Sequence, residues 1–162
     1  MRPCNLKSAF IAAFVVLLLP PARLELEITE LVLLQESESA LAVLHELRDL
    51  GMRIAMDDFG TGYSSLGYLR SFPFDKIKID ESFIRDLPSK EDSVAIVRAV
   101  VGLSSSLGIT TTAEGVETKE QLESLTSEGC NEVQGFLFSA PRPAAEVEHI
   151  LNEMAPRSEA VA

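Results

Sequence analysis

Ionisable and amide side chains recur beside the short apolar runs of this 162-residue chain, and their types suit metal and phosphate chemistry. They are Glu27 within Leu24–Thr29, Asp57 and Asp58 after Met52–Met56, Lys78 between Ile77 and Ile79, Glu114 after Ile109–Ala113, and Gln134 near the start of Val133–Phe138. Burying such groups costs free energy unless they are paired or bind a metal. Because each run carries at least one of them, we expect them to meet in a single site.

The adjacent carboxylates Asp57 and Asp58 are the most informative part of this set. Two like charges side by side need a neutralising cation, and carboxylate oxygens are ligands that Mg²⁺ and Mn²⁺ prefer. Lys78, if directed inward among carboxylates, would pair with them or with a phosphate. Taken singly, each residue has an ordinary alternative role, since an Asp at a strand end often caps a helix and a strand Glu or Lys often faces solvent. Together they favour a divalent-metal site.

The elements expected to position these residues alternate between strand and helix along the chain. We expect strands at Leu24–Thr29, Met52–Met56, Asp75–Asp80, Ile109–Ala113 and Val133–Phe138. We expect helices at Ser39–Leu50, Ser93–Leu107, Lys119–Glu128 and after Pro143, together with a Gly-rich loop at 59–62 that leads into a helical stretch through Leu69. Glycines 51, 108 and 129 are placed to end the first three of these helices.

Repeated strand–helix units indicate parallel strands joined by crossover helices. Acidic residues just after the strands favour an incomplete (β/α)8 TIM-type barrel, of which about the last five strand–helix units are present, because the sites of such barrels lie at the strand carboxyl ends. A doubly wound α/β sheet is the alternative, but the chain lacks the Gly-x-Gly-x-x-Gly phosphate fingerprint.

The composition limits the partners. The apolar fraction of 46% and the charged fraction of 24% are those of a globular protein. A net charge of −11 repels polyanions and argues against nucleic-acid binding, whereas a small phosphate ligand remains compatible if metal ions supply positive charge. Cys4 and Cys130 match no metal or redox spacing and indicate reduced thiols in a cytoplasmic protein.

The first 21 residues differ from the rest. Arg2 and Lys7 precede the apolar run Phe10–Leu19, which two prolines follow. This pattern resembles a signal peptide and is shorter than the span of about 20 apolar residues that a bilayer needs. A remnant barrel helix is the other interpretation. We expect an apolar leader at 1–21, the domain at 22–155, a disordered tail at 156–162, and a cytoplasmic location with membrane association through the leader as the alternative.

Five segments in order resemble the signature segments of the EAL domain family. They are Leu24–Glu30, Asp57–Leu66, Phe74–Asp80, Ala113–Thr118 and Gln134–Ser139, and the likeness runs from about Pro20 to Met154. The resemblance implies a phosphodiesterase that hydrolyses cyclic-di-GMP to the linear dinucleotide with two Mg²⁺ or Mn²⁺ ions. It also implies a possible homodimer and an upstream sensor or GGDEF-type domain as partners.

The resemblance also implies roles for individual residues. Glu27, Asp57 and Asp58 match metal ligands, and Lys78 and Glu114 match catalytic residues. Substrate and loop positions are matched by Glu30, Thr61, Gly62, Glu117 and Gln134.

The Glu-Ala-Leu segment that names the family, and an asparagine ligand expected after it, are not found upstream of Leu24. We therefore interpret the chain as the C-terminal portion of the domain, without about three strands. Three hypotheses stay open for it: a piece of an active phosphodiesterase, a non-catalytic module that binds the nucleotide or a protein, and a truncated product without a stable fold.

Overall fold

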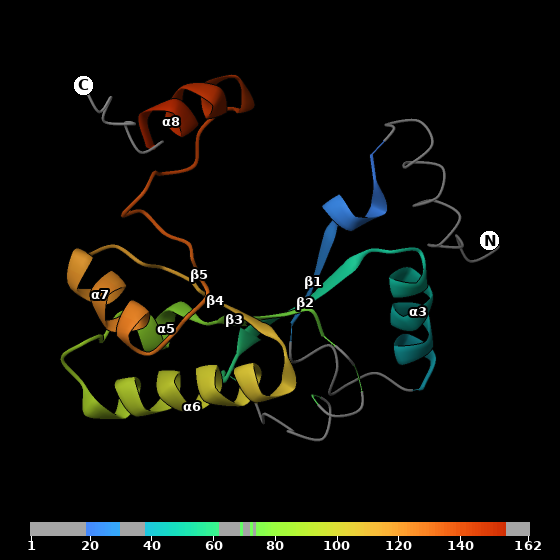
Figure 1. The fold of residues 1–162 in the computed structure, drawn as a ribbon, viewed down its shortest axis with the longest axis horizontal. Helices are drawn as coiled ribbons and strands as arrows, with labels where there is room; N and C mark the ends of the chain where they lie inside the picture. Colours follow the sequence, from blue (N-terminus) through green and yellow to red (C-terminus); the bar gives the residue numbers. More distant parts are fainter. Residues whose placement is uncertain (1–18, 30–37, 62–68, 70–71, 73, 155–162) are drawn as a thin grey trace, which may run out of the picture.

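The structure is a computed structural model, and it describes residues 19–29, 38–61, 69, 72 and 74–154 (Figure 1). Its strands are β1 Glu25–Thr29, β2 Arg53–Phe59, β3 Lys76–Ile79, β4 Thr110–Ala113 and β5 Glu132–Val133. Its helices are η1 Pro21–Arg23, α3 Glu38–Asp49, α5 Glu81–Ile84, α6 Glu91–Leu107, α7 Lys119–Ser127, η2 Ala144–Glu146 and α8 Val147–Met154.

The sheet decides the fold class. Its strands are all parallel, and their spatial order β1-β2-β3-β4-β5 is their order in the chain. In a doubly wound sheet the order in which strands are added reverses at a switch point. In a (β/α)8 barrel each new strand is added beside the last. The sheet of the described residues therefore confirms a partial α/β barrel.

The two faces of the sheet differ in chemistry because successive side chains of a strand point to opposite sides. Ile77 and Ile79 of β3 are fully buried in a core that also contains Val97 of α6 and Leu125 of α7. The other face carries Lys76 and Lys78 on β3 together with Glu25 and Glu27 on β1, as the strand register requires. The helices pack against the apolar face, and the polar face carries the charged side chains that could form a site.

Specific backbone and side-chain contacts mark the helix ends, and the one at Gly108 was predicted from the sequence. Gly108 ends α6 with a left-handed conformation, and its N–H donates to the carbonyls of Ser104 and Ser105. Thr118 begins α7 with a capping box, in which its hydroxyl accepts from Gln121 N–H and the Gln121 side chain accepts from the Thr118 N–H. The Gln121 amide nitrogen also donates to the Ile84 carbonyl at 3.1 Å, which ties α7 to the end of α5.

The predicted extent of the fifth strand is wrong. The strand ends at Val133, and residues 136–138 form a turn in which Phe138 N–H donates to the Gly135 carbonyl at 3.2 Å. Gly135 lies against the backbone of Val116, which donates to the Gln134 carbonyl and accepts from Leu137 N–H. This contact between distant segments bends the chain over the loop after β4. By contrast, β2 runs on through Phe59, past the predicted end at Met56.

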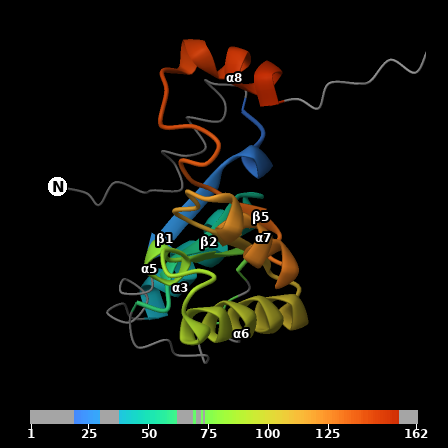
Figure 2. The same ribbon diagram turned by 90° about the vertical axis from the view of Figure 1, so that its left-hand side faces the viewer.

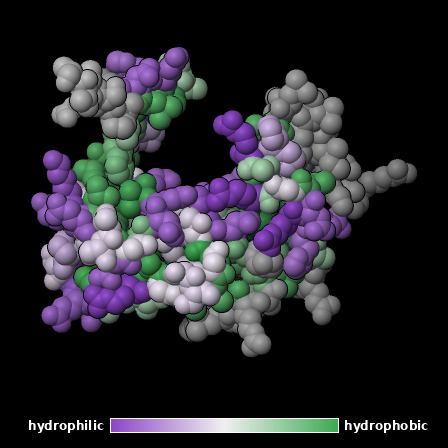
Figure 3. All heavy atoms as spheres, in the orientation of Figure 1, coloured by the Kyte–Doolittle hydropathy of each residue, from purple (hydrophilic) through white to green (hydrophobic). Residues whose placement is uncertain are grey.

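The segment after β5 leads away from the sheet to α8, which Figure 2 shows apart from the body of the molecule. Apolar surface lies on this segment and on α8 (Figure 3), where the exposed large side chains are Phe136, Phe138, Val147, Leu151 and Met154.

Several predictions concern residues outside the described part of the chain. These are residues 1–18 of the predicted leader, Glu30, Gly62, most of the helical stretch before Leu69, and the tail at 156–162. Within the described ranges, no helix has both the length and the apolar character that a membrane crossing requires.

Candidate active site

A buried lysine stands at the centre of the polar face. The Lys78 side chain is 7% exposed, and its Nζ lies 2.7 Å from Glu114 Oε1, 2.9 Å from Glu27 Oε1 and 3.0 Å from Asp57 Oδ1. The three carboxylates come from β1, β2 and the residue directly after β4, on both sides of β3. The sequence prediction that these four side chains meet is therefore correct in this structure.

Burial and charge act in opposite directions on these groups. Burial alone would lower the pKa of Lys78, but its close contacts with the carboxylates of Glu114, Glu27 and Asp57 raise it above the ordinary lysine value, so the ammonium is protonated at neutral pH. Burial raises the pKa of Glu114, Lys78 opposes that rise, and the nearby Asp57 and Glu27 add to it. The raised pKa prepares Glu114 to accept a proton.

A backbone irregularity brings two consecutive aspartates to the same place. The register between β2 and β3 shifts between Met56 and Phe59, and Asp58 has a φ of 53°, in the left-handed region. In a regular strand Asp57 and Asp58 would point to opposite faces, but a bulge re-aims a side chain. One oxygen each of Asp57, Asp58 and Glu114 lie within 4.8 Å of one another as a result.

These carboxylates fit a divalent cation. Asp57 Oδ1 is buried and has no hydrogen-bond partner among the described residues, and the Lys78 ammonium lies 3.0 Å from it as an ion-pair partner. A buried oxygen without a hydrogen-bond partner is costly and suits an ion. Burial raises the pKa of Asp58, as do the neighbouring charges of Asp57 and Asp80. An all-oxygen cluster of this kind matches the ligand preference of Mg²⁺ and Mn²⁺.

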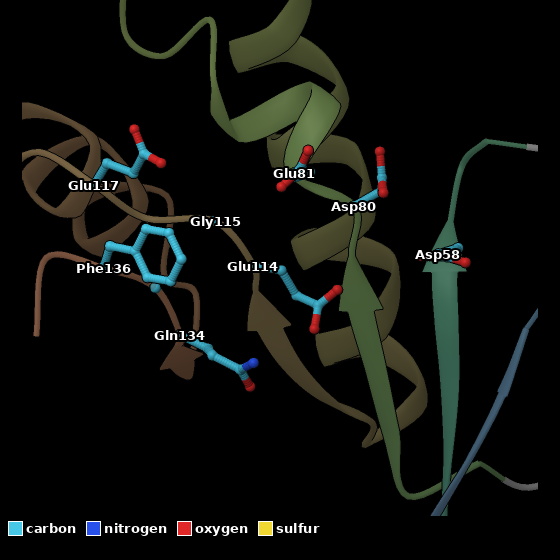
Figure 4. A pocket seen from close by; sticks show the side chains of 9 residues that line it. Asp58, Asp80, Glu81, Glu114, Gly115, Glu117, Gln134 and Phe136 are labelled. Atoms are coloured by element: carbon cyan, nitrogen blue, oxygen red, sulfur yellow. The ribbon is translucent and has the colours of Figure 1, made fainter. Parts of the chain in front are cut away.

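A cavity of about 390 Å³ opens beside the cluster (Figure 4). It is lined by Asp58, Asp80, Glu81, Glu114, Gly115, Glu117, Gln134, Gly135 and Phe136. Figure 4 shows Glu117 and Phe136 together on the opposite side of the cavity from Asp58. A volume of this size is within the range of about 300–1,000 Å³ that small-molecule sites occupy.

Five residues of this wall were absent from the predicted site residues: Asp80, Glu81, Gly115, Gly135 and Phe136. Asp80 follows β3 as Glu114 follows β4, so the rule that identified Glu114 applies to it equally. Its carboxylate accepts from Ser82 N–H at 3.0 Å and so caps α5. The carboxylate therefore has a structural role at the helix start as well as a place in the cavity wall.

The short helix α5 packs against the loops on both sides of the site. A Cβ at Gly60, where φ is 98°, would lie 2.8 Å from the Phe83 ring, and one at Gly115, where φ is 69°, would lie 2.7 Å from the Glu81 Cβ. Glycine is required at both positions by backbone conformation and by space. The loop after β2 and the loop after β4 are thereby held against one helix.

The remaining predicted residues are less central. Gln134 and Glu117 line the cavity, as expected of substrate positions, but both are exposed. Thr61 is exposed and is not part of the cavity wall; its hydroxyl donates to the Asp58 carbonyl at 2.9 Å and so supports the backbone that carries Asp58. Glu30 and Gly62 lie outside the described residues.

The family model described as EAL domain matches residues 1–141. The chain belongs to the EAL domain family. The chain is 45% identical over 128 residues to NbdA of Pseudomonas aeruginosa, named a cyclic di-GMP phosphodiesterase; the match covers 79% of this chain and 16% of that protein. This EAL chain spans between 16% and 21% of the length of the curated relatives that it matches.

Solved structures agree with the family assignment. The structure of the PaMucR phosphodiesterase in complex with c-di-GMP aligns with a TM-score of 0.84 and 42% identity, covering 90% of this chain and 59% of that one. A manganese and cy-diGMP complex of BlrP1 from Klebsiella pneumoniae aligns with a TM-score of 0.81 and 39% identity, covering 86% of this chain and 36% of that one.

Proposed function

We propose that this EAL chain carries the metal-binding and catalytic part of a domain that hydrolyses cyclic-di-GMP to the linear dinucleotide. The convergence of Glu27, Asp57 and Glu114 on the Lys78 ammonium, all within 3.0 Å, carries the proposal. Surplus carboxylates beside a cavity of small-molecule size form a site for cations and an anionic ligand. The phosphodiesterase names of the relatives support the same reaction.

The metal ligands would be Glu27, Asp57 and Asp58. They would hold two Mg²⁺ or Mn²⁺ ions, which when bound activate water and stabilise charge on phosphate oxygens. The buried Asp57 oxygen without a hydrogen bond supports this assignment, and the manganese complex of BlrP1 supports the choice of ion.

Lys78 and Glu114 would act on the reacting atoms. Lys78 remains protonated, so its ammonium can donate a hydrogen bond to the attacking water or to a phosphate oxygen. Glu114, with its raised pKa, accepts a proton from the attacking water while the water oxygen forms a bond to phosphorus. The bond from phosphorus to a ribose oxygen then breaks, that oxygen takes a proton from solvent water to become a hydroxyl group, and the linear product is released.

Other residues would bind substrate and order the loops. Gln134 and Glu117 lie in the cavity wall, where amide and carboxylate groups can contact the nucleotide. Thr61, with Gly62 and Glu30, would set the loop after β2, and the hydrogen bond from Thr61 to Asp58 supports that role.

The whole protein would include more than this chain. Because the chain spans 16% of the NbdA length, we infer a longer parent with an upstream sensor or GGDEF-type domain. We also propose homodimer formation through the loop after β2, and a cytoplasmic location, with membrane association through the leader at 1–21 as the alternative.

A hydrolysis assay with Mn²⁺ tests the proposal on this chain, on its Asp57→Asn variant and on a version extended upstream. We expect the extended protein to hydrolyse cyclic-di-GMP. The same extended protein with Asp57→Asn should not hydrolyse it. Calorimetry with and without Mn²⁺ runs in parallel. Tight binding of the nucleotide without turnover in the extended protein would instead identify a receptor and refute hydrolysis.

A further inference from the structure

A second charged layer lies beneath the candidate active site, on the same face of the sheet. Its centre is Lys76, two residues before Lys78 on β3, and its side chain is 11% exposed. Lys76 Nζ lies 3.0 Å from Glu25 Oε1 and 2.8 Å from Glu132 Oε2. These partners lie on the first and the fifth strand of the sheet, so one ammonium joins its two edges.

Further contacts complete this layer. The Thr112 hydroxyl donates to Glu132 Oε2 at 2.9 Å, and Arg53 Nη2 lies 3.5 Å from Glu25 Oε2. The hydrogen bonds to Glu25 and Glu132 oppose the effect of burial and raise the pKa of Lys76. Every charge in the layer thus has an opposite partner.

The layer bears on the site through the spacing of the strands. Glu25 lies two residues before Glu27 on β1, and Glu132 lies two residues before Gln134. Strand β5 has only two residues in its ladder with β4, so side-chain anchors matter more there than in the longer strands. A change in the curl of the sheet would move Glu27 and Gln134 relative to Lys78.

We propose that Lys76 is a positioning residue: by holding Glu25 and Glu132 together, it fixes the curl of the sheet that brings Glu27 and Gln134 to the metal and substrate site. The assignment of that site rests on the proposed function. Lys76 itself does not contact substrate in this scheme, because it lies beneath the site and is not part of the cavity wall.

Lys76→Met removes the ammonium and keeps an unbranched apolar stem, Lys76→Arg keeps the charge, and Lys90→Met removes an exposed lysine whose partner is Asp86. The first measurement is hydrogen exchange by mass spectrometry in metal-free protein. We expect faster exchange of segments 24–29 and 132–138 in Lys76→Met, unchanged exchange in α6, and recovery in Lys76→Arg. A uniform rise across the chain, or no change, would overturn the proposal.

The second measurement is the Mn²⁺ dissociation constant by calorimetry. Loss of a partner outside the ligand shell commonly weakens metal binding by about 10–100-fold, so we expect a rise of about tenfold in Lys76→Met, recovery in Lys76→Arg and none in Lys90→Met. Unchanged Mn²⁺ affinity in Lys76→Met would contradict the positioning role. If the unmodified chain binds no Mn²⁺, the proposed metal site fails, while hydrogen exchange still decides whether Lys76 holds the two edges.

Should Lys76→Met not fold, Glu132→Gln breaks the β5 side of the layer alone. We expect it to speed exchange at 132–138 and to leave 24–29 unchanged. Equal effects on both edges would overturn the inference that Lys76 acts through two separate contacts.

Discussion

Two charged layers lie one above the other on the same face of the sheet, and they differ in their balance of charge. The lower layer is the one around Lys76, and the upper layer is the candidate active site around Lys78. In the lower layer, Lys76 and Arg53 face Glu25 and Glu132, so two cations meet two carboxylates. In the upper layer, Lys78 contacts Glu27, Asp57 and Glu114, and Asp58 lies beside the last two, so one cation meets four carboxylates among the described residues.

The difference separates structure from chemistry. A balanced set of charges satisfies itself and can stabilise a sheet without a ligand. An excess of carboxylates at the strand ends is unfavourable until cations arrive. The same residue types, two positions apart on the strands, therefore serve architecture in one layer and ligand binding in the other.

The largest expected effect separates the layers by metal affinity. Asp57→Asn removes the charge of the buried oxygen that has no hydrogen bond. We expect its Mn²⁺ affinity to fall by more than the roughly 10–100-fold that loss of an outer partner causes. Calorimetry measures the affinity, with Asp86→Asn, a partly exposed partner of Lys90 away from the site, as the matched control. Equal Mn²⁺ affinity in Asp57→Asn and the unmodified chain would refute the assignment of the upper layer to metal.

A second variant measures what the single ammonium contributes. Lys78→Met leaves the four carboxylates of the upper layer without a cation, so we expect the free energy of unfolding to fall by about 1–3 kcal/mol in metal-free protein. Mn²⁺ should restore more stability in this variant than in the unmodified chain. Urea unfolding with and without Mn²⁺ measures both effects, with Lys90→Met as control. If Lys78→Met is as stable as Lys90→Met, the ammonium does not stabilise the carboxylates of the upper layer, and the proposed difference between the layers is wrong.

The smallest expected effect is a pH dependence of the lower layer. The hydrogen bond from Lys76 lowers the pKa of Glu132 below its ordinary value of 4.5. In that range the unfolded chain binds more protons than the folded one, so this stabilisation is complete above pH 4.5 and is lost as the pH falls through the lower folded value. Urea unfolding of metal-free protein between pH 3 and pH 7 should show a shallower loss in Glu132→Gln. Identical pH profiles would mean that the Lys76–Glu132 pair contributes nothing measurable.

Most of the fold could be predicted from local sequence. Period-two runs located the strands, a helical stripe located α6, and glycines such as Gly108 marked helix ends. The meeting of Glu27, Lys78 and Glu114 was predictable because carboxyl ends of parallel strands share one edge. Asp80 could have been found by that rule and was missed.

What could not be predicted depends on contacts between distant segments. The apolar run Val133–Phe138 has the pattern of a strand, but the packing of Gly135 on the Val116 backbone turns the chain, and the strand ends at Val133. The bulge that brings Asp58 beside Asp57 arises from the register with β3 and leaves no periodic signal. The lower layer was overlooked because Lys76 and Glu132 are ordinary solvent-facing types in isolation.

The left-handed backbone at Asp58 has a consequence for mutagenesis. Aspartate and asparagine tolerate this conformation better than other residues with a Cβ, so Asp58→Asn removes the charge while keeping the local path of the chain. Asp58→Ala would change the charge and the backbone preference together. A loss of function in this variant would be attributed to the missing carboxylate, although a straightened strand would cause part of the loss. An alanine scan across this strand would therefore overstate the role of one carboxylate and understate that of the peptide that carries it.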